Sequence, residues 1–124
     1  MSLLRKLLGK TGEDSASRFL AQQGYRILER NFSIPSGEID LIALDRDTLV
    51  FVEVKTRTSD AYGAPELAVD SRKQARMTKA ALAYLKSRKL HQMPCRFDVV
   101  AITRTPEERI ELIRNAFETN GGYR

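Results

Sequence analysis

The sequence predicts an α/β domain in which helices cover a mixed β-sheet. Apolar runs rich in β-branched residues, typical of buried strands, are interspersed with segments of helical periodicity. Read in order, these segments give α-β-β-β-α-β. The 124 residues are enough for one hydrophobic core and too few for two. We therefore expect a single domain over residues 1–124, with residues 1–10 and 119–124 as loose termini.

The first half of this order rests on helix-end signals and apolar runs. Thr11 precedes acidic residues and is predicted to cap a helix that stops near Gly24. Residues 25–32 form the first predicted strand. Residues 39–44 form the second, an apolar run interrupted by Asp40. A charged side chain inside an otherwise apolar strand makes this segment a candidate for function.

The second half contains the clearest helical pattern of the chain. Residues 49–55 are predicted to form a strand, and residues 71–89 a helix whose apolar face includes Tyr84 as a core residue. Residues 97–103 form a further buried strand. Residues 110–117 suit either a strand or a short helix, and the sequence does not decide between them.

Composition restricts the classes of function. Charged residues make up 30% of the chain and the net charge is +5, which favours a polyanionic partner such as DNA or RNA. No apolar run approaches the roughly 20 residues that span a bilayer, so we expect no membrane partner. One cysteine rules out a cysteine metal cluster, and a single histidine argues against a histidine-based zinc site and a Ser-His-Asp triad. Since no secretory signal is visible either, we expect a cytoplasmic protein.

The second and third predicted strands bring charged side chains together if they form a hairpin. A tight turn at residues 46–47 places Asp40 opposite Glu53 and Glu38 opposite Lys55. Directly opposed residues point to the same face, and alternation puts Glu53 and Lys55 on one face as well. The register depends on the turn, since a loop one residue longer removes the direct opposition. One hairpin is thus predicted to gather all four charges into one cluster.

The surroundings make such a cluster unfavourable without a counter-charge. The other side chains of both strands are largely apolar on both faces, so the strands are predicted to lie in the middle of the sheet. Two facing carboxylates repel there unless a cation or a proton neutralises one of them. A hard divalent ion with oxygen ligands meets this need. The alternative is an ion-pair patch in which Lys55 and Arg57 balance Glu38 and Asp40.

The cluster has the groups that phosphodiester hydrolysis needs. A Mg²⁺ (or Mn²⁺) ion held by Asp40 and Glu53 would lower the pKa of an attacking water and polarise the phosphoryl oxygen. Lys55 would orient or deprotonate that water and offset charge on the phosphate. The backbone carbonyl of Val54 is a further candidate ligand. These residues therefore predict a metal-dependent hydrolase of nucleic acid.

Two motifs carry a family resemblance. Gly37-Glu-Ile-Asp40 followed by Phe51-Val-Glu-Val-Lys-Thr-Arg57 resembles the PD-(D/E)-x-K nuclease superfamily. The closer match is to the YraN-like family of uncharacterised bacterial endonuclease-like proteins, which is similar to archaeal Holliday-junction resolvases. Further matching positions follow in the same order along nearly the whole chain, namely Gly12-Glu13, Gly24-Tyr25, Arg30-Asn31, Tyr62-Gly63, Lys73 and Arg96-Phe-Asp98. The superfamily motif alone is weak, but this ordered set is specific.

The resemblance implies a restriction-endonuclease-like fold, with Asp40 and Glu53 as metal ligands and Lys55 as the catalytic lysine. Glu13 matches the extra acid that resolvase-like members place near the metal. The alternative for Glu13 is an ordinary first-turn acid favoured by the helix dipole. The proline that usually precedes the aspartate is replaced by Ile39. By analogy with resolvases, a homodimer is also expected.

The expected function is therefore a Mg²⁺- or Mn²⁺-dependent endonuclease acting on DNA, with branched DNA as one substrate class. Arg57 and Lys73 are candidates for contact with the nucleic acid, although a helix lysine is more often simply solvated. Asp98 is expected to be structural and to pair with Arg96 or cap a neighbouring element. The alternative function is a non-catalytic nucleic-acid-binding module on a nuclease-like scaffold.

Overall fold

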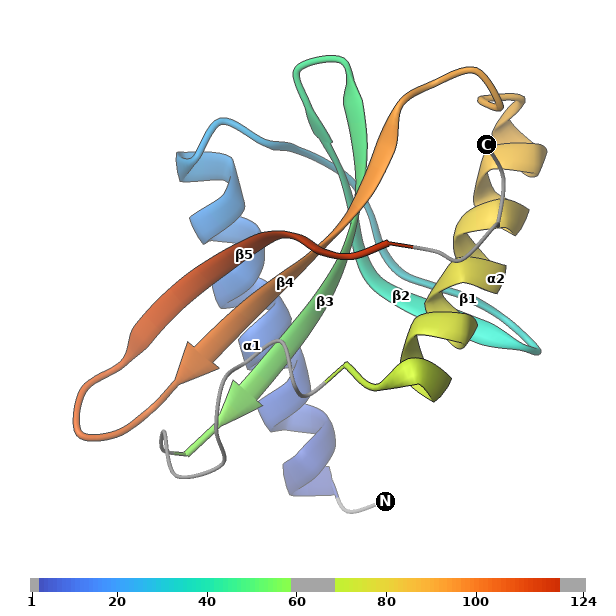
Figure 1. Cartoon of the computed structure of the whole chain (residues 1–124). Helices are drawn as coiled ribbons and strands as arrows, with labels where there is room; N and C mark the ends of the chain where they lie inside the picture. The colour runs from blue at the N-terminus through green and yellow to red at the C-terminus, as the bar shows by residue number, and fades with distance from the viewer. Residues whose placement is uncertain (1–2, 59–68, 119–124) are drawn as a thin grey trace.

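The computed structural model describes residues 3–58 and 69–118, with side chains from Gly12 onward (Figure 1). Its elements in chain order are α1 (Leu3–Gln22), β1 (Arg26–Ile34), β2 (Gly37–Asp45), β3 (Thr48–Arg57), α2 (Ser71–Arg88), β4 (Cys95–Thr103) and β5 (Arg109–Phe117). The predicted α/β class is confirmed. The last segment, which the sequence left open between strand and helix, is the strand β5.

Within the described residues the strands form one five-stranded mixed sheet, in the order β1-β2-β3-β4-β5. β3 and β4 are parallel, whereas the other neighbouring strands are antiparallel. Helices α1 and α2 cover opposite faces of the sheet (Figure 1). The central strands are therefore buried on both faces, which explains the nearly continuous apolar runs of β3 and β4.

Side chains of β3 alternate between two hydrophobic cores. Phe51 packs with Tyr84 on the α2 side, and Val52 packs with Leu20 on the α1 side. Tyr84 is 4% exposed and its ring lies edge-on to that of Phe51, with 6.2 Å between centroids. Its predicted place in the core is confirmed. The alternation also assigns Glu53, two residues beyond Phe51, to the α2 side.

Helix α1 begins earlier than the sequence predicted. It starts at Leu3, so Thr11 lies inside the helix instead of capping it, and residues 3–10 are helical where a loose terminus was expected. The leucines, arginine and lysines before Thr11 are strong helix formers, and they carry the helix past the cap signal. Neither α1 nor α2 has the combination of length and apolar character needed to cross a membrane.

A buried polar cluster joins the strands near the β2–β3 turn. Asp98 is fully buried and accepts hydrogen bonds from the Tyr25 hydroxyl at 3.1 Å and from Arg96 Nε at 3.0 Å. The backbone N–H of Asn115 is a third donor, at 2.9 Å. Arg96 also reaches Asp45 Oδ2 at 2.8 Å. A buried charge is tolerated when it is paired and hydrogen-bonded, so the structural role predicted for Asp98 is confirmed.

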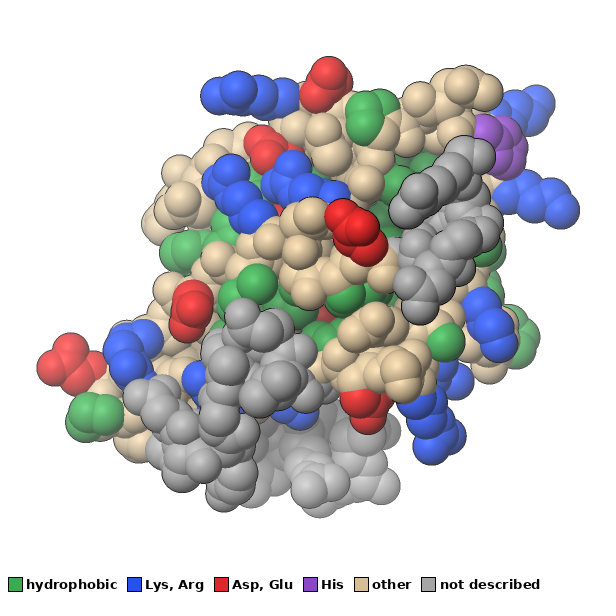
Figure 2. Space-filling view, viewed as in Figure 1, with side chains coloured by type: hydrophobic (Ala, Val, Ile, Leu, Met, Phe, Trp, Pro, Cys, Tyr) green, Lys and Arg blue, Asp and Glu red, His purple; other side chains and the backbone are tan. Residues whose placement is uncertain are grey.

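The positive charge of the chain does not form one continuous patch on the face shown in Figure 2. Described Lys and Arg side chains are scattered over that face and along its edge, with Asp and Glu side chains between them. Attraction of a polyanion depends on the local arrangement of charges as well as on their sum. The net charge of +5 therefore does not by itself locate a surface that binds a polyanion.

Candidate functional site

The β2–β3 hairpin follows the predicted register near its turn and departs from it further on. The five pairs nearest the turn form as predicted, and pairing then ends. The two predicted pairs of charged residues, Asp40 with Glu53 and Glu38 with Lys55, are not formed. The hairpin turn therefore determines the register of the pairs nearest to it, and other contacts determine where Asp40 and Glu53 lie.

The strands separate at Asp40, where the alternation of side chains along β2 is interrupted. Ile39 packs in the core on the α2 side and Leu41 in the core on the α1 side. Residues two apart in a regular strand share a face, so the backbone must twist between them. The Asp40 carboxylate lies toward β3, where its Oδ2 accepts the backbone N–H of Val54 at 2.8 Å. This side chain bridges the gap between the two strands.

The carboxylates of Asp40 and Glu53 are brought together even though their backbones are not paired. Glu53 is only 7% exposed. Its pKa is raised to about 8, chiefly by burial and next by the negative charge of Asp40, while Lys73 acts in the opposite direction. The Lys73 ammonium lies 3.2 Å from Glu53 Oε2, whereas Oε1 is buried without a hydrogen-bond partner. Two interacting carboxylates and an unsatisfied oxygen define a place where positive charge is favourable.

A third acid, Glu13, approaches this pair from α1. Burial is the main cause that raises the Glu13 pKa, and the charge of Asp40 acts in the same direction. Its Oε1 lies 3.9 Å from Arg30 Nη2. Among the described residues, no three Asp, Glu, His or Cys side chains gather closely enough to hold a metal ion. The site is therefore an acid pair with a third acid at its margin.

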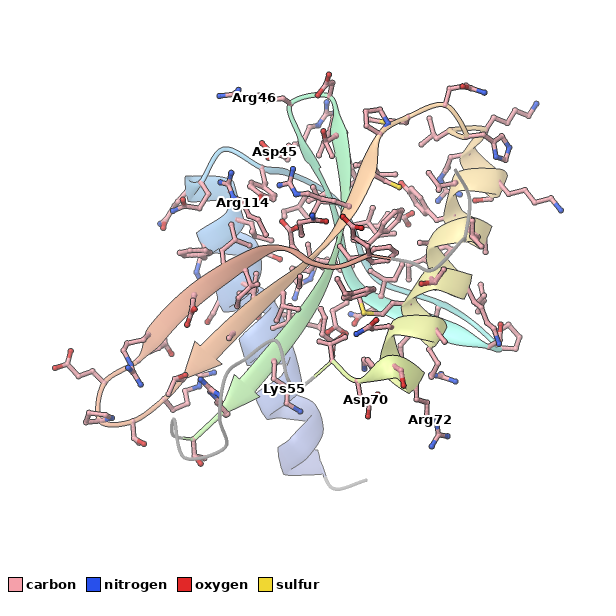
Figure 3. All side chains as sticks on the ribbon, in the orientation of Figure 1. Asp45, Arg46, Lys55, Asp70, Arg72 and Arg114 are labelled. Carbon is pink, nitrogen blue, oxygen red and sulfur yellow. The ribbon has the colours of Figure 1, made fainter. Side chains whose placement is uncertain are left out.

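Glu53 and Lys55 open into one pocket of about 470 Å³ between β3 and the start of α2. The described side chains that line it are all charged: Glu38, Glu53, Lys55, Asp70, Arg72, Lys73 and Arg76. Figure 3 shows Lys55 at the same end of the molecule as Asp70 and Arg72. Asp40 is half-buried and stands outside this described lining. A ligand in this pocket would thus meet Glu53, the exposed Lys55 and the basic side chains of α2.

The two residues predicted to contact nucleic acid occupy different places. Lys73 lines the pocket, whereas Arg57 is outside its described lining and donates from Nε to Thr103 Oγ1 of β4 at 3.2 Å. Glu38 forms an ion pair with Arg76 of α2 at 3.8 Å. The partner of Glu38 thus comes from α2. The ion-pair patch predicted as the alternative had assigned this role to Lys55 and Arg57.

Helix α2 and Gly37 contribute to the site in ways that the sequence analysis missed. Arg72 and Arg76 join Lys73 at the pocket. The helix can lie this close because β2 begins with glycine: a Cβ at Gly37 would come within 2.0 Å of the Arg76 carbonyl oxygen. Two signals in the sequence could have indicated these contributions: the basic residues at helical spacing, and the glycine that opens the Gly37-Glu-Ile-Asp40 motif.

The fold and the comparisons with known proteins define the class. A five-stranded mixed sheet flanked by two helices is compatible with a restriction-endonuclease-like fold. Residues 12–102 match the model of the uncharacterised protein family UPF0102. The chain belongs to this family, which is the YraN-like family that its motifs resemble.

Curated relatives of this family resemble the chain over most of its length. The UPF0102 protein of Syntrophus aciditrophicus (strain SB) is 55% identical over 111 residues, which are 89% of this chain and 87% of that protein. The UPF0102 protein of Moorella thermoacetica is 46% identical over 120 residues, 94% of this chain and 100% of that protein. The UPF0102 protein of Geobacter metallireducens is 51% identical over 119 residues, 95% and 98% of the two chains.

Proposed function

We propose that this protein is a divalent-metal-dependent endonuclease that hydrolyses phosphodiester bonds in DNA. The observation that carries the proposal is the buried Glu53 beside Asp40, with one unpartnered oxygen, in a pocket shared with Lys55. An acid pair of this kind is unfavourable on its own and becomes favourable with a cation.

The residues fit a hard dication such as Mg²⁺ or Mn²⁺. Carboxylate oxygens are the ligands such ions prefer, and Glu53 Oε1 is a buried oxygen without a partner. Asp40 and Glu53 are the proposed ligands, with the Val54 carbonyl and Glu13 as further candidates. When bound, the ion supplies Lewis-acid stabilisation of the charge that develops on the phosphoryl oxygens.

Backbone and side-chain groups of the protein itself orient and polarise the substrate. The Val54 N–H fixes the Asp40 carboxylate, so Asp40 is oriented before any ligand enters. Lys55 is exposed at the pocket and can donate to a phosphate oxygen or to the attacking water. Hydrolysis adds the water oxygen to phosphorus and breaks one P–O ester bond, leaving one phosphate monoester and one hydroxyl end.

Recognition of the sugar-phosphate backbone is supported by the chemistry of the pocket. Four of the seven described lining residues are Lys or Arg, and none is aromatic. Phosphate contacts position a nucleic acid without reading its sequence. We therefore propose cleavage without strong sequence preference. The resemblance to resolvases adds branched DNA as a substrate class and a homodimer as the assembly.

The test is a cleavage panel of linear, flapped and four-way-junction DNA with Mg²⁺ or Mn²⁺. The wild-type chain should cleave at least one substrate, and Asp40→Asn and Glu53→Gln should abolish the cleavage. Lys55→Met should reduce the rate at least about 100-fold, in the range typical of a lost acid–base or charge-stabilising group. The matched control is Lys79→Met, because Lys79 is exposed on α2 outside the described lining of the pocket.

Two results would contradict the proposal. Equal cleavage by the wild type and all three site variants would identify a contaminating nuclease. Salt-sensitive DNA binding without metal, and without product on any substrate, would assign the non-catalytic binding function instead.

A further inference from the structure

Lys73 stands in the first turn of α2 with its backbone held in place. Its N–H donates to Oδ1 of Asp70, the residue that caps the helix, at 2.9 Å. The next turn of the helix packs directly against Gly37 at the start of β2. The distance between the Lys73 ammonium and Glu53 can therefore change through the flexible side chain without movement of the helix.

The Lys73 ammonium occupies a position beside the acid pair where positive charge is favourable. Its Nζ lies 3.2 Å from Glu53 Oε2, and the two side chains are 30% and 10% exposed, respectively. This contact leaves Glu53 Oε1 without a partner. Asp40, held by the Val54 N–H, adds a second negative charge nearby. One ammonium can offset only one of the two negative charges that the carboxylates carry when both are ionised.

We propose that Lys73 is a stand-in cation: its ammonium occupies the place beside Glu53 in the metal-free protein, and a dication that binds there displaces it into the pocket, where it contacts a phosphate of the substrate. This inference rests on the proposed function, since it requires a metal and a phosphate in the same pocket. It gives Lys73 a role that differs from that of Lys55, whose side chain is exposed at the pocket from the start.

The pocket offers the displaced ammonium a short path. A lysine carries its charge on a flexible four-carbon stem, and Lys73 already lines the pocket together with Arg72 and Arg76. The ammonium can therefore move away from the Glu53 carboxylate and still remain in the pocket. Metal binding thus frees the Lys73 ammonium, which can then contact a phosphate in the pocket. By linkage, the metal and the nucleic acid strengthen the binding of each other.

The first experiment measures Mn²⁺ binding by the full chain without nucleic acid, from the electron paramagnetic resonance signal of the free ion. Lys73→Met removes the competing charge, so it is expected to bind Mn²⁺ about tenfold more tightly than the wild type. Lys79→Met changes a lysine of the same helix outside the described pocket lining and should bind Mn²⁺ like the wild type.

The second experiment measures binding of a short labelled DNA duplex by fluorescence anisotropy, with and without Ca²⁺, another hard dication. The wild type and Lys79→Met should gain affinity for DNA when Ca²⁺ is added. Lys73→Met should show a gain that is severalfold smaller, because it has no ammonium to release.

The outcomes separate this inference from the proposed function. Mn²⁺ binding by Lys73→Met that equals or falls below that of the wild type overturns the stand-in role and leaves the nuclease proposal intact. Absence of Mn²⁺ binding by both proteins removes the metal site and with it both proposals. If circular dichroism shows that Lys73→Met is unfolded, Lys73→Gln keeps a polar side chain and carries the same expectation.

Discussion

The Asp40 carboxylate accepts a hydrogen bond from the backbone N–H of Val54, at 2.8 Å, across the point where β2 and β3 separate. This contact links the two strands after their regular pairing has ended. It also keeps Asp40 beside Glu53, where its charge helps to raise the Glu53 pKa. The acid pair is therefore a product of the strand separation, and its electrostatic properties can be measured.

The first prediction concerns the pH dependence of stability without metal. Glu53 has a pKa of about 8 in the folded protein, against an ordinary value of 4.5. The folded state thus holds a proton that the unfolded state has lost, so this contribution to stability is complete below about pH 4.5 and is lost as the pH rises to about 8. Glu53→Gln, which mimics the protonated carboxyl, should become progressively more stable than the wild type over that window.

Urea unfolding in EDTA at several pH values between 5 and 8.5 measures this difference. We expect it to reach the order of a few kcal/mol at the upper end. Glu38→Gln is the control, because the Glu38 side chain is 52% exposed at the same pocket. A Glu53→Gln difference that stays constant with pH, or that matches the Glu38→Gln control, would show that Glu53 does not retain the proton.

The second prediction concerns stabilisation by metal. A dication at the acid pair must displace both the Lys73 ammonium and the proton held by Glu53. Because the proton competes less as the pH rises, Mg²⁺ or Mn²⁺ should raise the melting temperature more at pH 8 than at pH 6. Asp40→Asn should abolish the shift. Asp47→Asn, which removes an exposed acid from the β2–β3 turn, should retain it. Differential scanning calorimetry at both pH values tests this, and an equal shift in Asp40→Asn would assign the metal to another site.

The sequence predicted those parts of the fold that depend on local pattern. The tight turn predicted at residues 46–47 sets which residues of β2 and β3 oppose each other, and this register was correct for the five pairs nearest the turn. The break at Asp40 was not predictable in this way. It depends on Ile39 packing on the α2 side while Leu41 packs on the α1 side, and on the contact of Gly37 with α2. These are tertiary contacts between segments far apart in the chain.

The same distinction applies to the candidate site. Asp40 and Glu53 were found because charges in an apolar strand are conspicuous. Arg72 and Arg76 were missed because basic residues at the start of a helix are usually solvated, and only the packing of α2 against β2 brings them to the pocket. The last strand, β5, is assigned by its pairing with β4, which a local pattern does not reveal.

The third prediction concerns the contact between β2 and α2. In Gly37→Ala the new Cβ would lie 2.0 Å from the Arg76 carbonyl oxygen, which is backbone and cannot rotate away. Helix α2 must then move, so we expect a loss of about 2–3 kcal/mol in the free energy of unfolding. Gly24→Ala is the matched control. Its φ of 95° strains an alanine, but nothing lies within 4 Å of the new Cβ, so about 1 kcal/mol is expected.

Urea denaturation of both variants gives the two losses. Because α2 carries Lys73 and Arg76, Gly37→Ala should also weaken DNA binding, whereas Gly24→Ala should not. Equal losses in the two variants would mean that the α2 backbone adapts to the added methyl group without cost.

The fourth prediction separates stability from the site. The fully buried Asp98 accepts hydrogen bonds from three residues, namely Tyr25, Arg96 and the N–H of Asn115. Asp98→Ala leaves these donors and the Arg96 charge without their main acceptor, so it should cost about 3–5 kcal/mol. Asp45→Ala removes a half-buried partner of the same arginine and should cost about 1 kcal/mol.

Metal binding should nevertheless survive in Asp98→Ala at a temperature where the protein is folded. The Asp98 side chain meets Tyr25, which belongs to the core on the α1 side, whereas Glu53 is placed on the α2 side. If Asp98→Ala cannot be obtained folded, Asp98→Asn keeps the size of the side chain and part of its hydrogen bonding. Loss of Mn²⁺ binding in a folded Asp98 variant, with stability corrected for, would show that the acid pair depends on the polar cluster across the sheet.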